Sequence, residues 1–259
     1  MGLVSSLLSH PLTRGLDLDD PQTTELRKVI ISRKPFLRKI YQRWYSLIVE
    51  NLPAGNEPVL ELGSGAGFLK EYIPGLITSD IMPVRGCDLA CNALQLPFAD
   101  HSLRAIVMMN VLHHIPEPGV FFQEASRCVK RGGAMVMVEP WVSSWSRLVY
   151  SKLHHEPFDP GADSWGMPVS GPLSGGNDAL PWIIFARDLG RFKQENPSWL
   201  VKSITPGFPF SYLLSGGISL RSLVPGWMFV PVDRIESHLP AVLAGKTAMF
   251  ATIVLGNDK

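Results

Sequence analysis

Paired cysteines, long apolar runs and a strong net charge are all missing from this chain of 259 residues. Its three cysteines, Cys87, Cys91 and Cys128, lack CxxC spacing, so we expect reduced thiols rather than a disulfide framework or a zinc site. No apolar stretch reaches the ~18 residues that a membrane-spanning helix needs, and residues 1–15 lack the basic start of a signal peptide. The net charge of +1 indicates neither nucleic acid nor a membrane as partner. These absences predict a cytoplasmic globular protein.

Strand and helix signals alternate through the middle of the chain. Four short apolar segments predict buried strands, at residues 59–62, 76–80, 105–109 and 134–138. A helix is expected over 120–130, closed by the glycines Gly132 and Gly133. Buried apolar strands separated by helices are typical of a parallel, doubly wound sheet.

The second half of the chain predicts an insertion and the closing strands. Residues 156–181 hold many Pro, Gly and Ser, and Asn177-Asp178 predicts the start of a helix that runs through Phe192. Further strands are expected at 199–205 and 248–255, the latter antiparallel. The predicted fold is α/β, a Rossmann-like doubly wound sheet of seven strands whose last strand is antiparallel. We expect one domain, with a helical cap (1–54), a core (55–140), and a substrate-side insertion with the closing strands (141–259).

The N-terminal region predicts two helices within residues 20–51, separated at Pro35. From Phe36 on, apolar residues recur at three- and four-residue steps and predict one buried face: Leu37, Ile40, Tyr41, Trp44 and Ile48. Seven basic residues and no acidic one lie between positions 27 and 43: Arg27, Lys28, Arg33, Lys34, Arg38, Lys39 and Arg43. Two interpretations stay open, a solvated helix face or a positive cover over an anionic substrate or a lipid surface.

A glycine turn follows the first predicted strand, with Gly63, Gly65 and Gly67 in a Gly-x-Gly-x-Gly pattern. Glycine permits positive φ and lets a ligand approach the backbone. Dinucleotide-binding folds use the same device, but their third glycine or alanine would fall at Phe68, which disfavours that interpretation. Asp80 ends the second strand, where it could accept ribose hydroxyls or serve as a turn acid.

Five segments in order resemble the type 11 class of S-adenosylmethionine-dependent methyltransferases, over about residues 57–140. They are ELGSGAG, the acid at Asp80, NALQLPFADHSL, MMNVLHHIPEP and EASRCVKRGGAMVMVEP. The resemblance implies that the glycine loop supports the methionine part of the cofactor and that Asp80 holds the ribose. The adenine would meet Asn92-Ala93, where the family usually has Asp-Ala. The cofactor contacts so implied are Glu61, Gly63, Ser64, Gly65, Gly67, Asp80, Ile81, Asn92, Ala93 and Asn110.

Methyl transfer needs an aligned acceptor and, for a hydroxyl or an activated carbon, a base. His113 and His114 follow the third strand at the carboxyl edge of the sheet, and either could deprotonate a substrate or merely pack there. Glu139 ends the next strand at the same edge and could orient substrate, act as base or pair with an arginine. We expect no metal, because His154, His155 and Glu156 add no metal-binding spacing to the two histidines.

Five aromatic residues are candidates for an apolar acceptor pocket or for ordinary packing: Trp165, Trp182, Phe208, Phe210 and Tyr212. The predicted function is methyl transfer from S-adenosylmethionine to a small-molecule or lipid-linked acceptor. The basic helices further predict an anionic acceptor and weak contact with a membrane surface. Two alternatives stay open, a catalytically inactive S-adenosylmethionine-binding scaffold and a dinucleotide-binding oxidoreductase. No nucleic-acid partner is expected.

Overall fold

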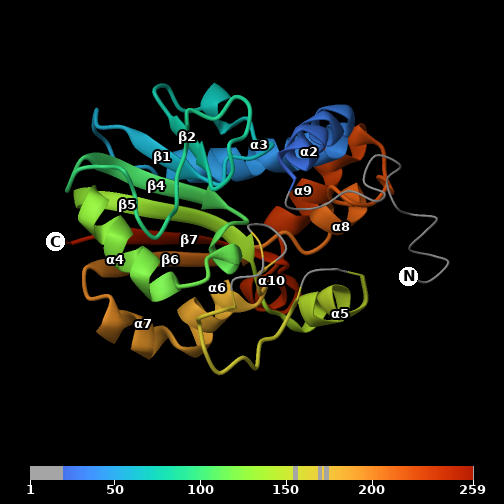
Figure 1. Ribbon diagram of the computed structural model, residues 1–259. Coiled ribbons are helices and arrows are strands. Elements are labelled where there is room, and N and C mark those ends of the chain that lie inside the picture. The colour runs from blue at the N-terminus through green and yellow to red at the C-terminus, as the bar shows by residue number, and fades with distance from the viewer. Residues whose placement is uncertain (1–19, 154–156, 169–170, 172–174, 259) are drawn as a thin grey trace.

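The computed structural model describes residues 20–153, 157–168, 171 and 175–258. Its centre is a seven-stranded sheet in the order β3-β2-β1-β4-β5-β7-β6 (Figure 1). Neighbouring strands from β3 to β5 are parallel, whereas β7 is antiparallel to both β5 and β6. The predicted α/β sheet with an antiparallel last strand is confirmed. The strands are β1 (Val59–Leu62), β2 (Ile77–Asp80), β3 (Leu89–Ala90), β4 (Leu103–Met109), β5 (Val129–Pro140), β6 (Trp199–Gly207) and β7 (Phe250–Asn257).

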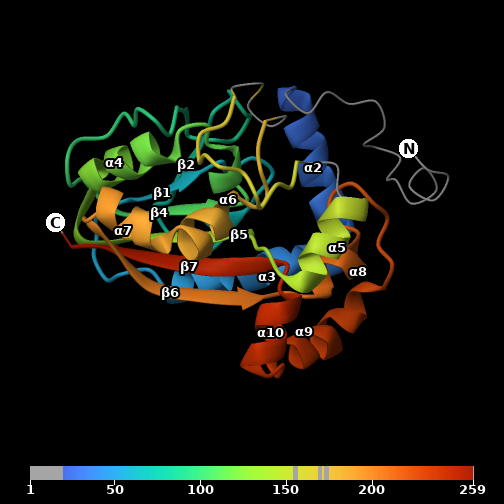
Figure 2. The same cartoon turned by 90° about the horizontal axis from the view of Figure 1, so that it is seen from below.

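Helices cover both faces of the sheet, with α4 and α7 on one side and α3, α9 and α10 on the other (Figure 2). The first group packs into one hydrophobic core and α3 into a second, so the sheet is buried on both faces. The α-helices are α2 (Pro21–Arg33), α3 (Pro35–Glu50), α4 (Pro118–Cys128), α5 (Ser144–Leu153), α6 (Leu180–Trp182), α7 (Leu189–Glu195), α8 (Ser211–Ser215), α9 (Phe229–Ser237) and α10 (Ala241–Thr247).

The two predicted N-terminal helices are confirmed. Both begin with proline, whose fixed φ suits the first helical position, and the Asp20 carboxylate caps α2 by accepting from the backbone N–H of Gln22 at 2.8 Å. The predicted apolar face of α3 is buried throughout. Trp44 joins α3 to segments that are distant in sequence, because its ring contacts those of Phe208 and Phe250.

The connections on the β1–β3 side differ from the strand–helix alternation expected there. After β1 the chain forms only a short 3₁₀ turn, η2 (Leu69–Glu71), and Pro74 and Gly75 follow before β2. Residues 81–88 and 91–102 contain no helix. The cover for this side comes from α3, which precedes the sheet in sequence.

Two predicted helices end differently from expectation. The helix predicted over 120–130 stops at Cys128, and Gly132 and Gly133 lie inside β5, where Gly132 has φ +73°. They accompany an irregularity in the β4–β5 register rather than a helix end. The helix predicted through Phe192 is interrupted, since a π-turn, η4 (Ile183–Arg187), separates α6 from α7. Asn177 still supports its start, because its Oδ1 accepts from the N–H of Ala179 at 3.1 Å.

The sequence analysis missed one strand and one insertion. The seventh strand is β3, two residues long, and it pairs with the end of β2. The predicted insertion before the last two strands is present at 141–198, but a second one, 208–249, separates β6 from β7. This second insertion carries α8, the 3₁₀ turn η5 (Gly226–Met228), α9 and α10.

Candidate functional site

A cavity of about 620 Å³ opens at the carboxyl ends of β1, β2 and β4. This size lies within the range of small-molecule sites. One wall consists of the glycine loop, the end of β2 and the loop after β3, and the other comes from η3 (Leu112–His114) and both insertions. We call these the β1–β3 wall and the insertion wall. From α2, Thr24 and Arg27 also border the cavity.

The glycine loop is fixed to β2 by backbone contacts. Gly63 and Gly65 have φ of +63° and +43°, the left-handed region that favours glycine. The Ser64 N–H donates to the Ser79 carbonyl at 2.8 Å, and the Gly65 N–H donates to Asp80 Oδ2 at 3.2 Å. These bonds set the loop and the Asp80 carboxylate side by side at the cavity.

Tyr45 of α3 supports the same loop from behind. Its hydroxyl accepts from the Phe68 N–H at 2.9 Å, and a Cβ on Gly67 would lie 2.8 Å from that hydroxyl. A side chain at the third glycine would therefore clash with this hydroxyl and with the Ser64 carbonyl, 2.9 Å away. The sequence analysis did not single out Tyr45, since it lies on an apolar helix face.

Phe68 occupies the position where a dinucleotide fold needs glycine or alanine. Its ring packs against Tyr45, with centroids 4.8 Å apart, and under the Arg38 guanidinium at 4.4 Å. The loop then enters a 3₁₀ turn of three residues, not a long helix whose N-terminus could bind a pyrophosphate. The dinucleotide alternative does not fit this geometry.

Two acids lie at and below the loop. Asp80 borders the cavity, accepts from Met82 N–H through Oδ1 at 3.1 Å, and has its pKa raised by burial. Glu61 does not border the cavity but lies beneath the loop, where burial and then the nearby Asp80 raise its pKa to about 7, against an opposing hydrogen bond with Ser64. The direct cofactor contact expected of Glu61 is therefore replaced by support of the loop.

The β1–β3 wall is open enough for a ligand at Gly65. A methyl group built there would stand 3.7 Å from Asp80 Oδ2 and 3.8 Å from the Thr24 methyl carbon, so the missing side chain leaves space beside the carboxylate. The Gly65 backbone and the Asp80 carboxylate are therefore both accessible to a ligand at this wall.

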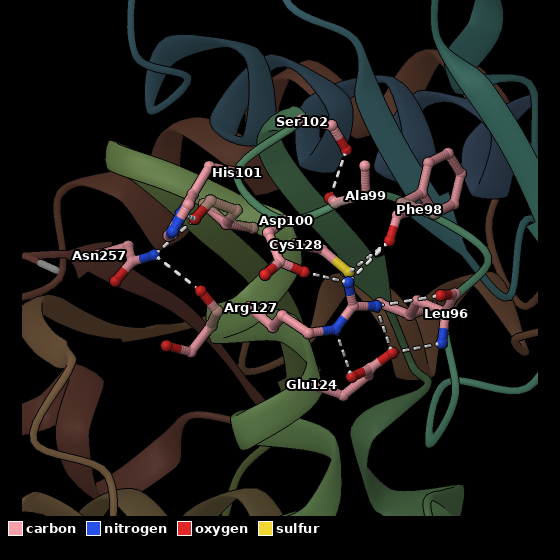
Figure 3. Close-up of polar contacts among 12 residues, drawn as sticks. Leu96, Phe98, Ala99, Asp100, His101, Ser102, Glu124, Arg127, Cys128 and Asn257 are labelled. Atoms are coloured by element: carbon pink, nitrogen blue, oxygen red, sulfur yellow. Dashed lines mark hydrogen bonds and ion pairs between the residues drawn. The ribbon is translucent and has the colours of Figure 1, made fainter.

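Arg127 of α4 anchors the loop that carries Asn92 and Ala93 (Figure 3). Its guanidinium pairs with Glu124 and Asp100 at 2.7 Å each and donates to the Phe98 carbonyl at 2.8 Å. These contacts join the NALQLPFAD segment to the EASR segment. At the cavity end, Asn92 Oδ1 accepts from the Leu94 N–H at 2.9 Å, which shapes the turn.

His113, His114 and Glu139 meet at the opposite side of the cavity. Glu139 is fully buried, and its Oε1 accepts from the N–H groups of Val111 and Leu112 at 2.8 and 2.9 Å. Its Oε2 lies 2.7 Å from His113 Nδ1. Glu139 thus fixes the η3 turn and the His113 ring, and it does not border the cavity as a base would.

Both histidines border the cavity, but they differ in burial. His113 is 2% exposed, and its Nε2 lies 3.5 Å from Asp178 Oδ1, so carboxylates face both ring nitrogens. His114 is half-buried, and its Nδ1 lies 2.6 Å from the Gly175 carbonyl. The rings are 4.2 Å apart. Asp178 of the first insertion is buried and belongs to this cluster. The sequence predicted it only as part of a helix start.

The rest of the insertion wall is largely apolar and aromatic. It includes Tyr150, Met167, Tyr212, Ile218 and Phe250. Of the five candidate aromatic residues, Tyr212 alone borders the cavity. The others pack elsewhere; Trp165, for example, donates to Asp188 at 2.9 Å.

The basic N-terminal residues lie in different environments: Lys28 and Arg33 are exposed, Arg27 borders the cavity, and Lys34 is buried. Lys34 is 5% exposed, and its ammonium donates to the carbonyls of Gly217 and Leu220, the latter at 2.8 Å. Burial lowers the pKa of Lys34 to about 8. Lys39 donates to Gly226 at 3.4 Å. These hydrogen bonds connect the second insertion to the N-terminal helices.

Two arginines of α3 form ion pairs with other elements, and one of these pairs reaches the second insertion. Arg43 lies 3.8 Å from Asp233 of α9, and Arg38, over Phe68, lies 3.6 Å from Glu71. Arg27 is the one lysine or arginine among the described residues that border the cavity.

Nine of the ten expected cofactor residues border the cavity, Glu61 being the exception. His154, His155 and Glu156 lie outside the described residues. Within the part of the chain that the structure describes, no group of three or more His, Cys, Asp or Glu is placed to hold a metal ion. No helix in those same ranges is long and apolar enough to cross a membrane.

Comparison with known proteins gives a family-model match over part of the chain and a similar fold. Residues 60–137 match the family model described as a methyltransferase domain. No curated protein matches the sequence. The structure of the Streptomyces coelicolor A3(2) geranyl diphosphate C-methyltransferase, solved with Mg²⁺, geranyl diphosphate and S-adenosylhomocysteine, is similar with a TM-score of 0.53. The two chains are 14% identical, over 96% of this chain and 90% of the other.

A second similar structure is a chain in the complex between the Haloferax volcanii Trm112 methyltransferase activator and a methyltransferase. Its TM-score is 0.50 at 14% identity, over 90% of this chain and 94% of that one. At such identities the likeness shows the fold alone.

Proposed function

We propose that this chain is an S-adenosylmethionine-dependent methyltransferase, as the match of residues 60–137 to a methyltransferase-domain model supports, and that it methylates a small acceptor with an apolar body, bound against the insertion wall. One observation carries the proposal. The same cavity is bordered by the glycine loop and Asp80 on one side and by His113, His114 and an aromatic surface on the other. Cofactor and acceptor would therefore meet inside one enclosed space.

The β1–β3 wall would hold S-adenosylmethionine. Gly63 to Gly67 would face its amino-acid part, Asp80 its ribose and Asn92-Ala93 its adenine. Asp80 keeps acceptor capacity beyond its two backbone contacts, because a carboxylate offers about four lone-pair sites. The bound cofactor supplies an activated methyl group, so the protein's main task is to align the acceptor.

His114 is the side chain best placed to take a proton from the acceptor. The Gly175 carbonyl can only accept, so Nδ1 carries the ring proton and Nε2 is the basic nitrogen. His113 is more deeply buried and faces two carboxylates. It would position the His114 ring through their 4.2 Å contact, while Glu139 fixes His113.

The charges at the cavity favour an acceptor without a diphosphate. Arg27 is accompanied by three acids that border the cavity, Asp80, Glu117 and Asp178. The Streptomyces coelicolor neighbour is named for geranyl diphosphate, but this cavity offers little positive charge for such a group. An uncharged or lipid-like acceptor is more compatible with the insertion wall.

The test uses methyl-labelled S-adenosylmethionine and cell extract separated into organic-soluble, aqueous small-molecule and macromolecular fractions. We expect label in a small molecule of the organic fraction. His114→Ala should lower turnover about 10²- to 10⁴-fold while S-adenosylhomocysteine binding stays unchanged. The control is His101→Asn, since His101 is exposed, lies away from the cavity and has a φ of +56° that asparagine tolerates. Label confined to protein or RNA would contradict the proposal, and cofactor binding without turnover would favour an inactive scaffold.

A further inference from the structure

The second insertion presents an exposed apolar face that the proposed function does not use. Its outer side chains are strongly exposed, with Trp227 at 72% and Val242 at 70%. Six of the large apolar residues that are exposed in the described part of the chain lie within residues 223–243, and such a concentration indicates an interaction surface. None of them borders the cavity. We call this set the outer face: Leu223, Trp227, Val230, Ile235, Val242 and Leu243.

The charged side chains around the outer face have one sign. Arg221, Arg234 and Lys246 are exposed on the same insertion. Its two acids are partly buried, and each has a partner. Asp233 pairs with Arg43 at 3.8 Å, and Glu236 accepts from the N–H groups of Phe210 and Ser211 at 2.7 Å each, at the start of α8. Within the described part of residues 208–249, no exposed acid offsets the three exposed cations.

A basic depression adjoins this face. Arg33 and Arg221 both border a shallow hollow of about 450 Å³, next to the exposed Leu223 and Trp227. Two arginines beside an indole and aliphatic side chains match a bilayer interface, where cations meet phosphates and tryptophan sits at headgroup level. A second copy of the chain would instead set like charges against each other in a two-fold pairing.

We propose that the outer face docks on an anionic lipid bilayer. The surface belongs to the same insertion that supplies Tyr212, Ile218 and Ser219 to the cavity, so docking would bring the insertion wall to the membrane. This assignment replaces the membrane contact expected through the N-terminal helices, of whose basic residues Arg33 takes part. The inference is independent of the methyl acceptor and concerns where the enzyme binds.

The test is co-sedimentation with vesicles of phosphatidylcholine alone or mixed with phosphatidylglycerol. We expect binding to the mixed vesicles, weakened by salt. Replacing Arg221, Arg234 and Lys246 by Gln should weaken binding roughly a hundredfold, at about fivefold per charge. Trp227→Ser should weaken it as well. S-adenosylhomocysteine binding by both variants should match wild type, because none of these residues borders the cavity.

A matched control lies on the opposite face of the sheet. Val120→Ser on α4 and Lys193→Gln on α7 also remove an exposed apolar group and a cation, and they should bind vesicles as wild type does. The proposal is overturned if wild type ignores mixed vesicles, binds neutral ones equally, or binds normally after the outer-face changes. Self-association that Trp227→Ser abolishes, without vesicle binding, would also overturn it and assign the face to a second copy.

Discussion

The two walls of the cavity are built by different means. The β1–β3 wall is held by backbone hydrogen bonds and buried carboxylates, such as Gly65 N–H to Asp80, within a short stretch of chain. The insertion wall is assembled from distant segments by aromatic packing and by lysine-to-carbonyl contacts, such as Lys34 to Leu220. The first arrangement suits a ligand that does not vary and whose polar groups need hydrogen-bond partners at fixed positions. The second suits a site for the acceptor, because the insertions can vary in sequence without changing the residues of the β1–β3 wall.

The largest expected effect tests the β1–β3 wall directly. Gly65→Val places a branched side chain beside the Asp80 carboxylate at a residue with φ +43°, so S-adenosylhomocysteine binding should be lost in calorimetry. Gly75→Val is the matched control, since Gly75 also has positive φ, at +72°, but its Cβ would meet nothing within 4 Å. Unchanged affinity in Gly65→Val would mean that the loop does not face the ligand.

The buried acid beneath the loop should make stability depend on pH. The pKa of Glu61 is about 7 in the folded protein against an ordinary 4.5, so its stabilising contribution is complete below pH 4.5 and is lost as pH rises through 7. The loss amounts to roughly 3 kcal/mol, at 1.36 kcal/mol per pKa unit. Glu61→Gln removes the titration, and urea denaturation at pH 5 and pH 8 should show a flatter dependence than wild type. If the unfolding free energy changed equally between pH 5 and pH 8 in Glu61→Gln and wild type, the raised pKa of Glu61 would be contradicted.

Arg127 tests whether the adenine side of the β1–β3 wall depends on its anchor. Arg127→Met removes the contacts to Glu124, Asp100 and the Phe98 carbonyl, and should cost about 2–3 kcal/mol of unfolding free energy. S-adenosylhomocysteine should bind more weakly, because the loop with Asn92 loses its support. Lys193→Gln on α7 serves as the control for a surface cation. A variant with normal affinity would show that the loop holds its shape without the arginine.

The smallest effect concerns the insertion wall. Lys34→Gln removes two ammonium-to-carbonyl contacts and should lower the unfolding free energy by about 1–2 kcal/mol. Cofactor affinity should stay unchanged, whereas the Michaelis constant for the acceptor should rise, since Ile218 and Ser219 lie between the two carbonyls in sequence and border the cavity. Lys39→Gln, which loses one contact at 3.4 Å, should do little. Weaker cofactor binding in Lys34→Gln would show that the two walls do not act independently.

The β1–β3 wall was also the more predictable part from sequence. Its residues lie at the ends of short apolar strands, and parallel strands bring their carboxyl ends to one edge, so Gly63 and Asp80 could be placed together from spacing alone. Glu61 shows the limit of that reasoning, because the alternation of a four-residue strand does not tell whether its acid faces the ligand or supports the loop.

The insertion wall could not be predicted in the same way. The contacts of Lys34 with Gly217 and Leu220 join residues more than 180 positions apart, and nothing local in either segment signals them. Asp178 could be recognised as a helix-cap candidate but not as a neighbour of His113, since that requires the path of the whole first insertion. The basic residues illustrate the same point, because a sequence cannot show which cations fold inward.

The placement of β7 has a consequence for how the molecule is made. This strand, at residues 250–257, lies between β5 and β6, and the carbonyl of Met249, just before the strand, accepts from the Trp141 N–H beside the end of β5. During synthesis one edge of β5 therefore stays unpaired until residues 250–257 have left the ribosome. The cofactor pocket would mature late, and nascent chains stalled before residue 250 should be the ones that chaperones retain.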